Sequence, residues 1–125
     1  MAACPPAYLR QLAERAGGDG NPPPVRIYCF GGDAVPHSSF ELAKRALRPP
    51  YIINGYGPTE TVVTPLTWKA GPDDTRGAAY APSGSRTGER RAYVCDRALC
   101  LLPAALAGVL YLGGARICRG YRARS

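Results

Sequence analysis

Long apolar runs are absent from this sequence of 125 residues. No stretch approaches the roughly 20 apolar residues that a membrane-spanning helix requires. The first residues contain Pro5 and Pro6 and have neither a basic start nor an apolar core, so no export signal is expected. The 46% apolar and 20% charged residues are typical of a soluble globular chain and exclude wholesale disorder. We therefore expect a cytoplasmic protein with no membrane partner.

Histidine and paired cysteines are also scarce, which limits the chemistry to be considered. The chain has one histidine, His37, and no serine in a convincing nucleophile elbow, so a His-dependent catalytic triad is not expected. The five cysteines have irregular spacing without a C-x-x-C pair, and with one histidine they make no plausible zinc set. Cys29 and Cys95 lie in apolar runs, where free cysteine behaves as a small buried hydrophobe. We expect reduced thiols and no metal bound by them.

Acidic residues are few: the chain has 9 Asp and Glu against 16 Lys and Arg, which gives a net charge of +7. A basic balance can indicate a polyanionic partner. The arginines are scattered singly as far as Arg76, and they become dense only from Arg86 onward. No aromatic residues interleave with them in a way that suits base stacking. Solvent-exposed charge is therefore favoured over nucleic-acid binding.

The first half of the chain alternates between helix and strand patterns. Helical spacing follows Pro5-Pro6, and Gly17-Gly18 is expected to end that helix. A nearly continuous apolar run over residues 25–30, interrupted by Arg26, predicts a strand covered on both faces. Ser38 and Glu41 have the spacing of a capping box in front of a second helix. This order of strand, turn and helix predicts an α/β fold.

Strand patterns dominate the rest of the chain. Residues 51–53 and 62–68 each predict a strand, and the second is interrupted by Pro65. The turn-rich segment 70–88 predicts a linker or a long surface loop. Residues 91–95 and 108–112 follow with no helix pattern between them, which predicts an antiparallel pair. The chain thus changes character near residue 80.

One loop directly after a buried strand carries most of the chemical information. Residues Asn54–Thr61 read N-G-Y-G-P-T-E-T, and ligands collect at such strand ends in open α/β sheets. Tyr56 offers a ring face to a purine, Thr59 a hydroxyl to an anion, and Glu60 an oxygen ligand that suits Mg²⁺. These residues favour a nucleotide-phosphate site. An ordinary tight turn with a surface tyrosine and glutamate is an equally open interpretation of composition alone.

The same string resembles the signature of adenylate-forming enzymes, and specifically of the amino-acid-activating adenylation domains of nonribosomal peptide synthetases. Two more segments agree with that family in order and spacing. Phe30–Val35 resembles F-G-G-E-A, and Gly108–Tyr121 resembles G-E-L-Y-I-G-G-x-G-L-A-R-G-Y. Ala81–Gly84 and Arg91–Asp96 follow the family's P-I-G-x-P and V-Y-V-L-D patterns. The resemblance covers most of the chain.

The resemblance implies part of the adenylate-forming fold. Residues 1–78 would be a piece of the large α/β subdomain, with the adenine and phosphate loop, and residues 79–125 a piece of the small β-barrel-like subdomain. The implied reaction joins ATP and an amino acid into an aminoacyl-adenylate and releases pyrophosphate. The acyl group then passes to the phosphopantetheine thiol of a partner carrier protein.

The resemblance also implies roles for individual residues. Tyr56 would stack on the adenine of ATP or AMP, and Asn54 and the turn Gly31-Gly32-Asp33 would line the edge of the base. Thr59 would contact the α-phosphate and Glu60 would help to hold Mg²⁺, which makes both of them catalytic residues. The residues expected to bind the nucleotide are Gly31, Gly32, Asp33, Asn54, Tyr56, Gly57 and Thr59. The residues expected to line an uncharged, roomy amino-acid pocket are Cys29, Gly31, Gly55, Val63 and Thr64.

Several features depart from the family pattern. Ser83, Val109 and Arg116 stand where Ile, Glu and Gly are usual, and an arginine at a position that needs a positive φ strains the backbone. No segment resembles the family's phosphate loop or its C-terminal lobe with the catalytic lysine, and neither Lys44 nor Lys69 lies in a matching context. We expect negligible adenylation by this polypeptide alone. The alternatives are a non-catalytic truncated remnant, half of a split enzyme, or a small basic binding module.

Overall fold

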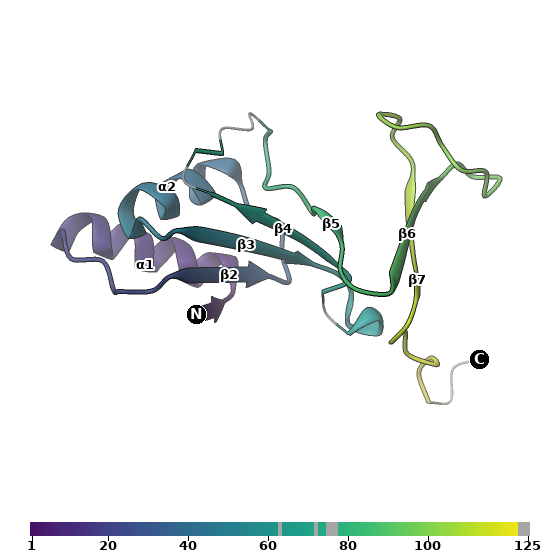
Figure 1. Ribbon diagram of the computed structural model, residues 1–125, viewed down its shortest axis with the longest axis horizontal. Helices are drawn as coiled ribbons and strands as arrows, with labels where there is room; N and C mark the ends of the chain where they lie inside the picture. Colours follow the sequence, from purple (N-terminus) through teal and green to yellow (C-terminus); the bar gives the residue numbers. More distant parts are fainter. Residues whose placement is uncertain (63, 72, 75–77, 123–125) are drawn as a thin grey trace.

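The computed structural model describes residues 1–122 apart from 63, 72 and 75–77 (Figure 1). Its helices are α1 (Pro6–Asp19), α2 (His37–Leu47) and the short 3₁₀ helix η1 (Thr59–Thr61). Its strands are β1 (Ala2–Cys4), β2 (Ile27–Gly31), β3 (Tyr51–Tyr56), β4 (Leu66–Ala70), β5 (Ser85–Arg86), β6 (Arg90–Cys95) and β7 (Val109–Gly114). Within these described ranges, no helix is both long enough and apolar enough to cross a bilayer.

The first five strands form one mixed sheet in the order β1-β2-β3-β4-β5. Strands β1, β2 and β3 run parallel, and α1 and α2 provide the crossover connections that parallel neighbours require. Strand β4 is antiparallel to β3, and the two-residue β5 is antiparallel to β4. The α/β fold class expected from the sequence is confirmed.

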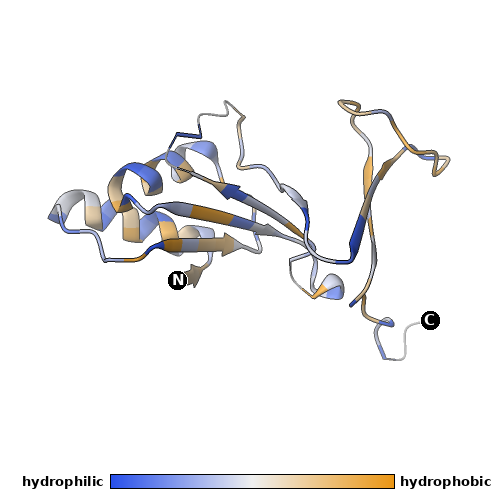
Figure 2. Ribbon diagram, viewed as in Figure 1, coloured by the Kyte–Doolittle hydropathy of each residue, from blue (hydrophilic) through white to orange (hydrophobic). Residues whose placement is uncertain are grey.

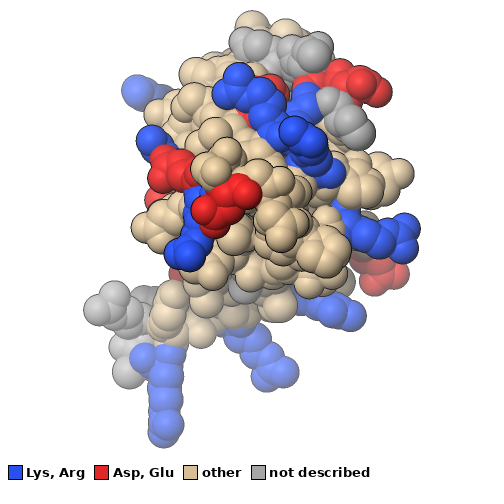
Figure 3. Space-filling model, turned by 90° about the vertical axis from the view of Figure 1, so that its left-hand side faces the viewer, with Lys and Arg blue, Asp and Glu red and all other residues tan. Residues whose placement is uncertain are grey.

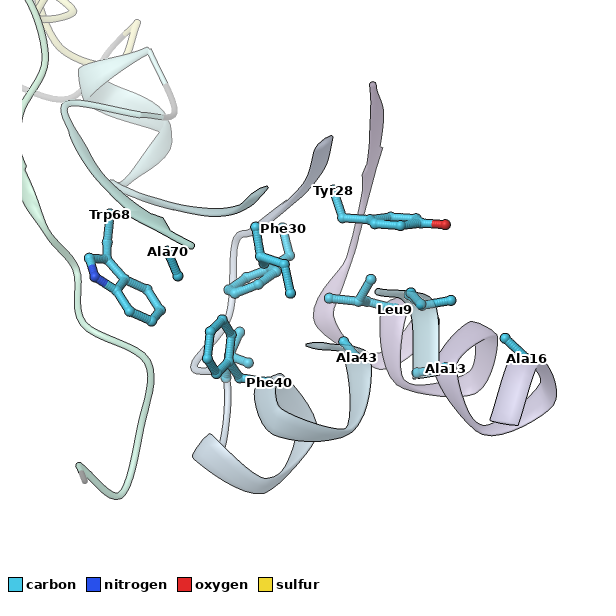
Figure 4. Packing of buried hydrophobic residues seen from close by; sticks show 12 residues of the cluster. Leu9, Ala13, Ala16, Tyr28, Phe30, Phe40, Ala43, Trp68 and Ala70 are labelled. Atoms are coloured by element: carbon cyan, nitrogen blue, oxygen red, sulfur yellow. The ribbon is translucent and has the colours of Figure 1, made fainter. Parts of the chain in front are cut away.

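Both long helices pack on the same face of this sheet, and the hydrophobic core lies between the helices and the sheet (Figure 4). Leu9 and Ala13 of α1 are buried, as are the strand side chains Tyr28 and Phe30. The Phe40 ring of α2 packs on Trp68 of β4 with ring centroids 5.0 Å apart. Burial of these apolar side chains is the main force that holds the helices on the sheet.

Strands β6 and β7 form a separate antiparallel hairpin that stands away from the first sheet in Figure 1. Tyr93 lies opposite Tyr111, and the register runs from the pair Arg90–Gly114 to the pair Cys95–Val109. The antiparallel pair expected over residues 91–95 and 108–112 is therefore present, with one strand starting one residue earlier and the other extending to Gly114. Most hairpin side chains are exposed, so this part of the chain has little core of its own.

Three local features of the first sixty residues differ from expectation. Helix α1 continues through Gly17-Gly18 to Asp19, and Gly20, whose φ is +68°, is its C-cap residue. The helix α2 begins at His37, so Ser38 lies inside it and is not its N-cap residue. The N-cap residue is Pro36, and no side chain makes a capping hydrogen bond. Strand β1 has no clear sequence pattern, since a three-residue edge strand is defined only by its pairing with β2.

The chain between β3 and β6 also differs from its expected layout. Strand β3 extends to Tyr56, while β4 begins only at Leu66 because Val62 has a left-handed φ of +53° that breaks an extended run. Segment 70–88 is more than a surface loop: β5 pairs with β4, and the Ala81 amide donates to the Val35 carbonyl at 2.9 Å. The division of the chain into two subdomains near residue 78 stays a prediction.

Candidate functional site

A cavity of about 430 Å³ opens where the parallel strands β2 and β3 end at their carboxyl termini. Open α/β sheets bind ligands at this edge, and the volume is within the range of small-molecule sites, about 300–1,000 Å³. The lining residues come from the β2–α2 connection, from the end of β3 and from the segment after residue 79. They are Gly32, Asp33, Ala34, Val35, Asn54, Gly55, Tyr56, Gly57, Pro58, Tyr80, Ala81 and Ser83.

Glycines let the backbones of β2 and β3 come unusually close beside this cavity. Gly31 and Gly55 are Cα partners, and a Cβ on Gly31 would overlap the carbonyl oxygen of Gly55. A Cβ on Gly55 would lie 2.6 Å from Cγ2 of Thr64. Gly32, which follows β2, has a φ of +87°, in the region that side chains rarely adopt. The two strand ends can therefore approach closely and turn sharply into the cavity wall.

Aromatic and polar side chains complete the lining. Tyr56 lines the cavity and is 43% exposed, so it is not part of the packed core. Asn54 is buried, and its Nδ2 donates to the Pro82 carbonyl at 2.8 Å, which joins β3 to the segment after residue 79. Asp33 accepts a 2.7 Å hydrogen bond from the Ala34 amide. The arrangement offers a flat apolar contact with polar groups at its edge.

Thr59 and Glu60 follow the cavity wall but do not line it. They begin η1, the turn directly after Pro58. One carboxylate oxygen of Glu60 accepts a 2.6 Å hydrogen bond from the hydroxyl of Tyr121, and its carbonyl accepts from the Cys118 amide at 2.8 Å. The Tyr121 hydrogen bond holds the pKa of Glu60 below its usual range, which stabilises the ionised carboxylate.

Glu60 could bind Mg²⁺ only if a bound ligand supplied further oxygen atoms to the metal. Among the residues that the structure describes, no group of three or more His, Cys, Asp or Glu side chains could hold a metal ion. Mg²⁺ is commonly held by one or two carboxylates together with substrate phosphates. One ionised carboxylate beside a nucleotide-sized cavity fits that pattern.

Of the residues expected to contact an amino acid, those on β2 and β3 lie on the sheet face opposite the helices. Tyr28 and Phe30 point into the helix-side core, so the alternating neighbours Cys29 and Gly31 face the other way, level with Gly55. Thr64 contacts this face at Gly55, while Val63 lies outside the described residues. Burial raises the pKa of the Cys29 thiol, which keeps it protonated and favours a packing role over a nucleophilic one.

Several residues at the site were not identified from the sequence. Ala34, Val35, Pro58, Tyr80, Ala81 and Ser83 line the cavity. Tyr80 and Ala81 come from a segment expected to be a loop, and their approach depends on the bridge from Pro36 to Tyr80, which no local pattern shows. Tyr121 lies 61 positions after Glu60, and only its place in a family-like motif singled it out. Long-range contacts account for the omission of Tyr80, Ala81 and Tyr121, whereas Ala34-Val35 and Pro58 directly follow residues that were predicted.

Comparison with known proteins identifies the family. A profile of the AMP-binding enzyme family matches residues 1–122, and this chain belongs to that family. It is 35% identical over 120 residues to surfactin synthase subunit 1 of Bacillus subtilis (strain 168), a match that covers 93% of this chain and 3% of that protein. It is 31% identical over 116 residues to malpibaldin synthetase of Mortierella alpina, a match that covers 93% of this chain and 2% of that protein. The resemblance to nonribosomal peptide synthetases seen in the sequence is confirmed.

Solved structures show the same fold. The nonribosomal peptide synthetase protein PA1221, which contains adenylation and PCP domains, aligns with a TM-score of 0.85 at 22% identity, over 98% of this chain and 21% of that chain. FmoA3 in its alpha-methyl-L-serine-AMP bound form aligns with a TM-score of 0.81 at 21% identity, over 96% of this chain and 14% of that chain. The N-terminal subdomain of Klebsiella oxytoca NpsA, in complex with 3-hydroxybenzoyl-AMSN, aligns with a TM-score of 0.78 at 21% identity, over 95% of this chain and 30% of that chain. This chain spans 3% of surfactin synthase subunit 1 and no more than 30% of any of these three solved chains.

Proposed function

We propose that this chain supplies the adenine-binding part of an amino-acid-activating adenylation domain. The observation that carries this proposal is the cavity at the ends of β2 and β3, lined by Tyr56 in a chain of the AMP-binding enzyme family. In the proposed reaction an amino-acid carboxylate attacks the α-phosphate of ATP, and pyrophosphate leaves. The aminoacyl group then passes to the phosphopantetheine thiol of a carrier protein.

Binding of the purine is assigned to the cavity. Tyr56 provides a partly exposed ring on which adenine can stack, a contact worth about 1–3 kcal/mol per base. Asn54 and Asp33 lie at the polar edge, and Gly32 and Gly57 allow the backbone to approach a flat ligand. The alpha-methyl-L-serine-AMP bound to FmoA3, a protein of the same fold, agrees with this assignment.

Binding of phosphate and metal is assigned to the turn after the cavity. Thr59 would donate to the α-phosphate, and Glu60 would bind Mg²⁺ together with phosphate oxygens. The metal, when bound, neutralises charge that develops on the transferred phosphoryl group. The chain's own contribution is the Tyr121 hydroxyl, which orients the Glu60 carboxylate and stabilises its ionised form.

Contact with the amino acid is assigned to Cys29, Gly31 and Gly55 on the far face of the sheet and to Thr64 beside Gly55. Val63, which lies outside the described residues, is assigned to the same contact. The three of these residues that lie on β2 and β3 are small, so the wall leaves room for a side chain and carries no charge. The carboxylate would lie at the strand ends, where Gly31 and Gly55 allow close approach to the nucleotide.

We propose in addition that this polypeptide alone binds nucleotide without appreciable turnover. A cationic side chain at the reacting phosphate contributes greatly to such reactions through electrostatic stabilisation. Both lysines are engaged elsewhere, because Lys44 donates to the Asp74 carbonyl at 2.6 Å and Lys69 lies 3.7 Å above the Tyr51 ring. Neither lysine lines the cavity.

The test is a titration of ATP with Mg²⁺ into the isotopically labelled chain, followed by NMR. Tyr56→Ala should lower the affinity about tenfold, as expected for the loss of one stacked base. Tyr8→Ala is the matched control, since Tyr8 is an exposed tyrosine on α1 away from the cavity. Equal affinities for the two variants would refute purine binding by Tyr56, and robust amino-acid-dependent ATP–pyrophosphate exchange would refute the proposal of binding without turnover.

A further inference from the structure

Four arginines gather in two adjoining hollows at the base of the β6–β7 hairpin, a surface we call the basic hollow. Arg86 and Arg91 line the larger hollow, of about 740 Å³, and Arg116 lines the smaller one, of about 350 Å³. Arg90 lines both. None of the residues of the basic hollow belongs to the cavity at the ends of β2 and β3, so the two sites are distinct.

The positive charge of the basic hollow is not neutralised by the protein. Glu89 is the one acidic lining residue, and none of the four arginines forms an ion pair within 4 Å among the described residues. On α1, by contrast, Arg10 and Arg15 each pair with an acidic residue four positions later. Figure 3 shows acidic and basic side chains, red and blue, together on the end of the molecule that lies on the left in Figure 1. The hollow thus brings together four arginines with one acidic residue, whereas the two arginines of α1 are each paired.

Arg90 in particular has a hydrogen-bonding capacity that the protein leaves unused. Its Nε is buried and has no hydrogen-bond partner within the described part of the chain, while Nη1 makes one long contact, 3.5 Å, with the Thr87 carbonyl. A buried charged donor without an acceptor is costly in free energy, and a bound anion would supply the acceptor. Arg116 is held at a left-handed φ of +65°, which costs backbone energy at this same place.

The chemistry of the basic hollow selects the class of ligand. Guanidinium groups bind phosphate oxygens in a bidentate manner, and several of them around one concavity suit a compact anion with more than one negative charge. None of the described residues that line the hollow is aromatic, so it has no platform for the stacked bases of single-stranded nucleic acid. We propose that the basic hollow binds a free inorganic polyphosphate anion of the size of pyrophosphate.

Isothermal titration calorimetry of pyrophosphate into the full chain tests this site. The double variant Arg90→Gln with Arg91→Gln should weaken binding by about tenfold or more, because hydrogen bonds between charged groups are the strong ones. Arg97→Gln is the matched control, since Arg97 is exposed and lies outside the hollow, and it should leave the affinity unchanged. Tyr56→Ala should also leave pyrophosphate binding unchanged, which separates this site from the proposed nucleotide site.

A further variant keeps the result independent of folding. Arg116→Gly removes one charge and relieves the left-handed backbone, so pyrophosphate should bind more weakly while the unfolding midpoint stays level or rises. Absence of pyrophosphate binding would overturn the proposal. It would also be overturned if Arg97→Gln weakened binding as much as the double variant, or if a single-stranded oligonucleotide bound more tightly than pyrophosphate, since either result would indicate a diffuse basic surface.

Discussion

The α/β unit, residues 2–86, and the β6–β7 hairpin, residues 90–114, differ in where they keep their apolar side chains. Among the described residues, every member of the buried hydrophobic core lies between Leu9 and Ala70, and Cys95 is the one buried hydrophobic residue of the hairpin. The hairpin instead exposes large apolar side chains, among them Leu101, Leu106 and Val109. Figure 2 shows the apolar colour on the open strands and loop of this hairpin.

Charge separates the same two regions. Residues 1–85 have nearly balanced charge, whereas residues 86–125 contain eight arginines and two acidic residues. A two-stranded hairpin without a packed face is marginal in water. The stability of the molecule therefore depends on the helix-covered sheet, and the hairpin contributes exposed apolar and basic surface.

The largest effect should come from a cavity in the core of the α/β unit. Phe40 is 1% exposed and packs on Trp68. Phe40→Ala should lower the free energy of unfolding by about 3–5 kcal/mol, the usual cost of deleting a buried phenylalanine ring. Urea denaturation followed by the fluorescence of Trp68, the one tryptophan of the chain, measures this loss.

Tyr111→Ala is the matched change in the hairpin. Tyr111 is exposed and faces Tyr93 across the strand pair, so its removal should cost about 1 kcal/mol or less. Comparable losses for Phe40→Ala and Tyr111→Ala would show that the two regions share one cooperative core, and the contrast between a packed unit and an open hairpin would fail.

A smaller effect is expected at the close approach of β2 and β3. Gly31→Ala places a methyl group against the backbone carbonyl of Gly55, which can move only with the strand. Overpacking of this kind should cost about 1–3 kcal/mol of unfolding free energy in the same denaturation experiment.

Gly18→Ala provides the opposite control. Gly18 lies in α1 with open space around the position of a Cβ, so the substitution should raise stability by about 0.5–1 kcal/mol through the helix propensity of alanine. A stabilising Gly31→Ala would mean that the strands are not in contact as described.

The smallest effect links the hairpin side of the molecule to the site. The Tyr121 hydrogen bond lowers the pKa of Glu60, so its contribution to stability is complete above the ordinary glutamate value of about 4.3 and is lost as pH falls through the lower folded-state pKa. Tyr121→Phe should raise the pKa of Glu60 toward its ordinary range. An NMR titration of the Glu60 carboxyl carbon measures this shift.

Tyr111→Phe serves as the control for that titration, because Tyr111 lies on β7 and takes no part in the Glu60 contact. A pKa of Glu60 that is equally low in wild type and in Tyr121→Phe would show that the contact between these two side chains does not form.

The periodicity of the sequence predicted the helices and strands whose apolar pattern lies within the element itself. The apolar run before Gly31 and the helical spacing from Phe40 to Leu47 correspond to β2 and α2. The continuation of α1 through Gly17 was not predicted from the local pattern; Gly17 lies beside Ala46 of α2, a tertiary contact that the pattern does not show. The start of α2 was missed for a related reason, since Pro36 fixes the helix entry without a capping side chain.

Residues of the site were likewise predicted where the local sequence pattern marks them, and missed where contacts between distant segments bring them to the cavity. The glycines and the tyrosine at the end of β3 could be identified from order alone, since a loop after a buried strand lies at the ligand-binding edge. The part of the cavity wall formed by Tyr80 and Ala81 could not be identified in this way. These residues reach the cavity through backbone contacts to Pro36 and Val35. The contact of Tyr121 with Glu60 joins two regions that no local pattern relates.

The most direct measurement of the central claim is a set of intermolecular NOEs between the adenine protons of bound nucleotide and the ring protons of Tyr56. Stacking predicts strong NOEs from both adenine ring protons to the Tyr56 ring, and weaker ones to Asn54 at the base edge. Nucleotide that binds but gives NOEs only to hairpin residues such as Tyr93 or Tyr111 would contradict the assignment of the cavity.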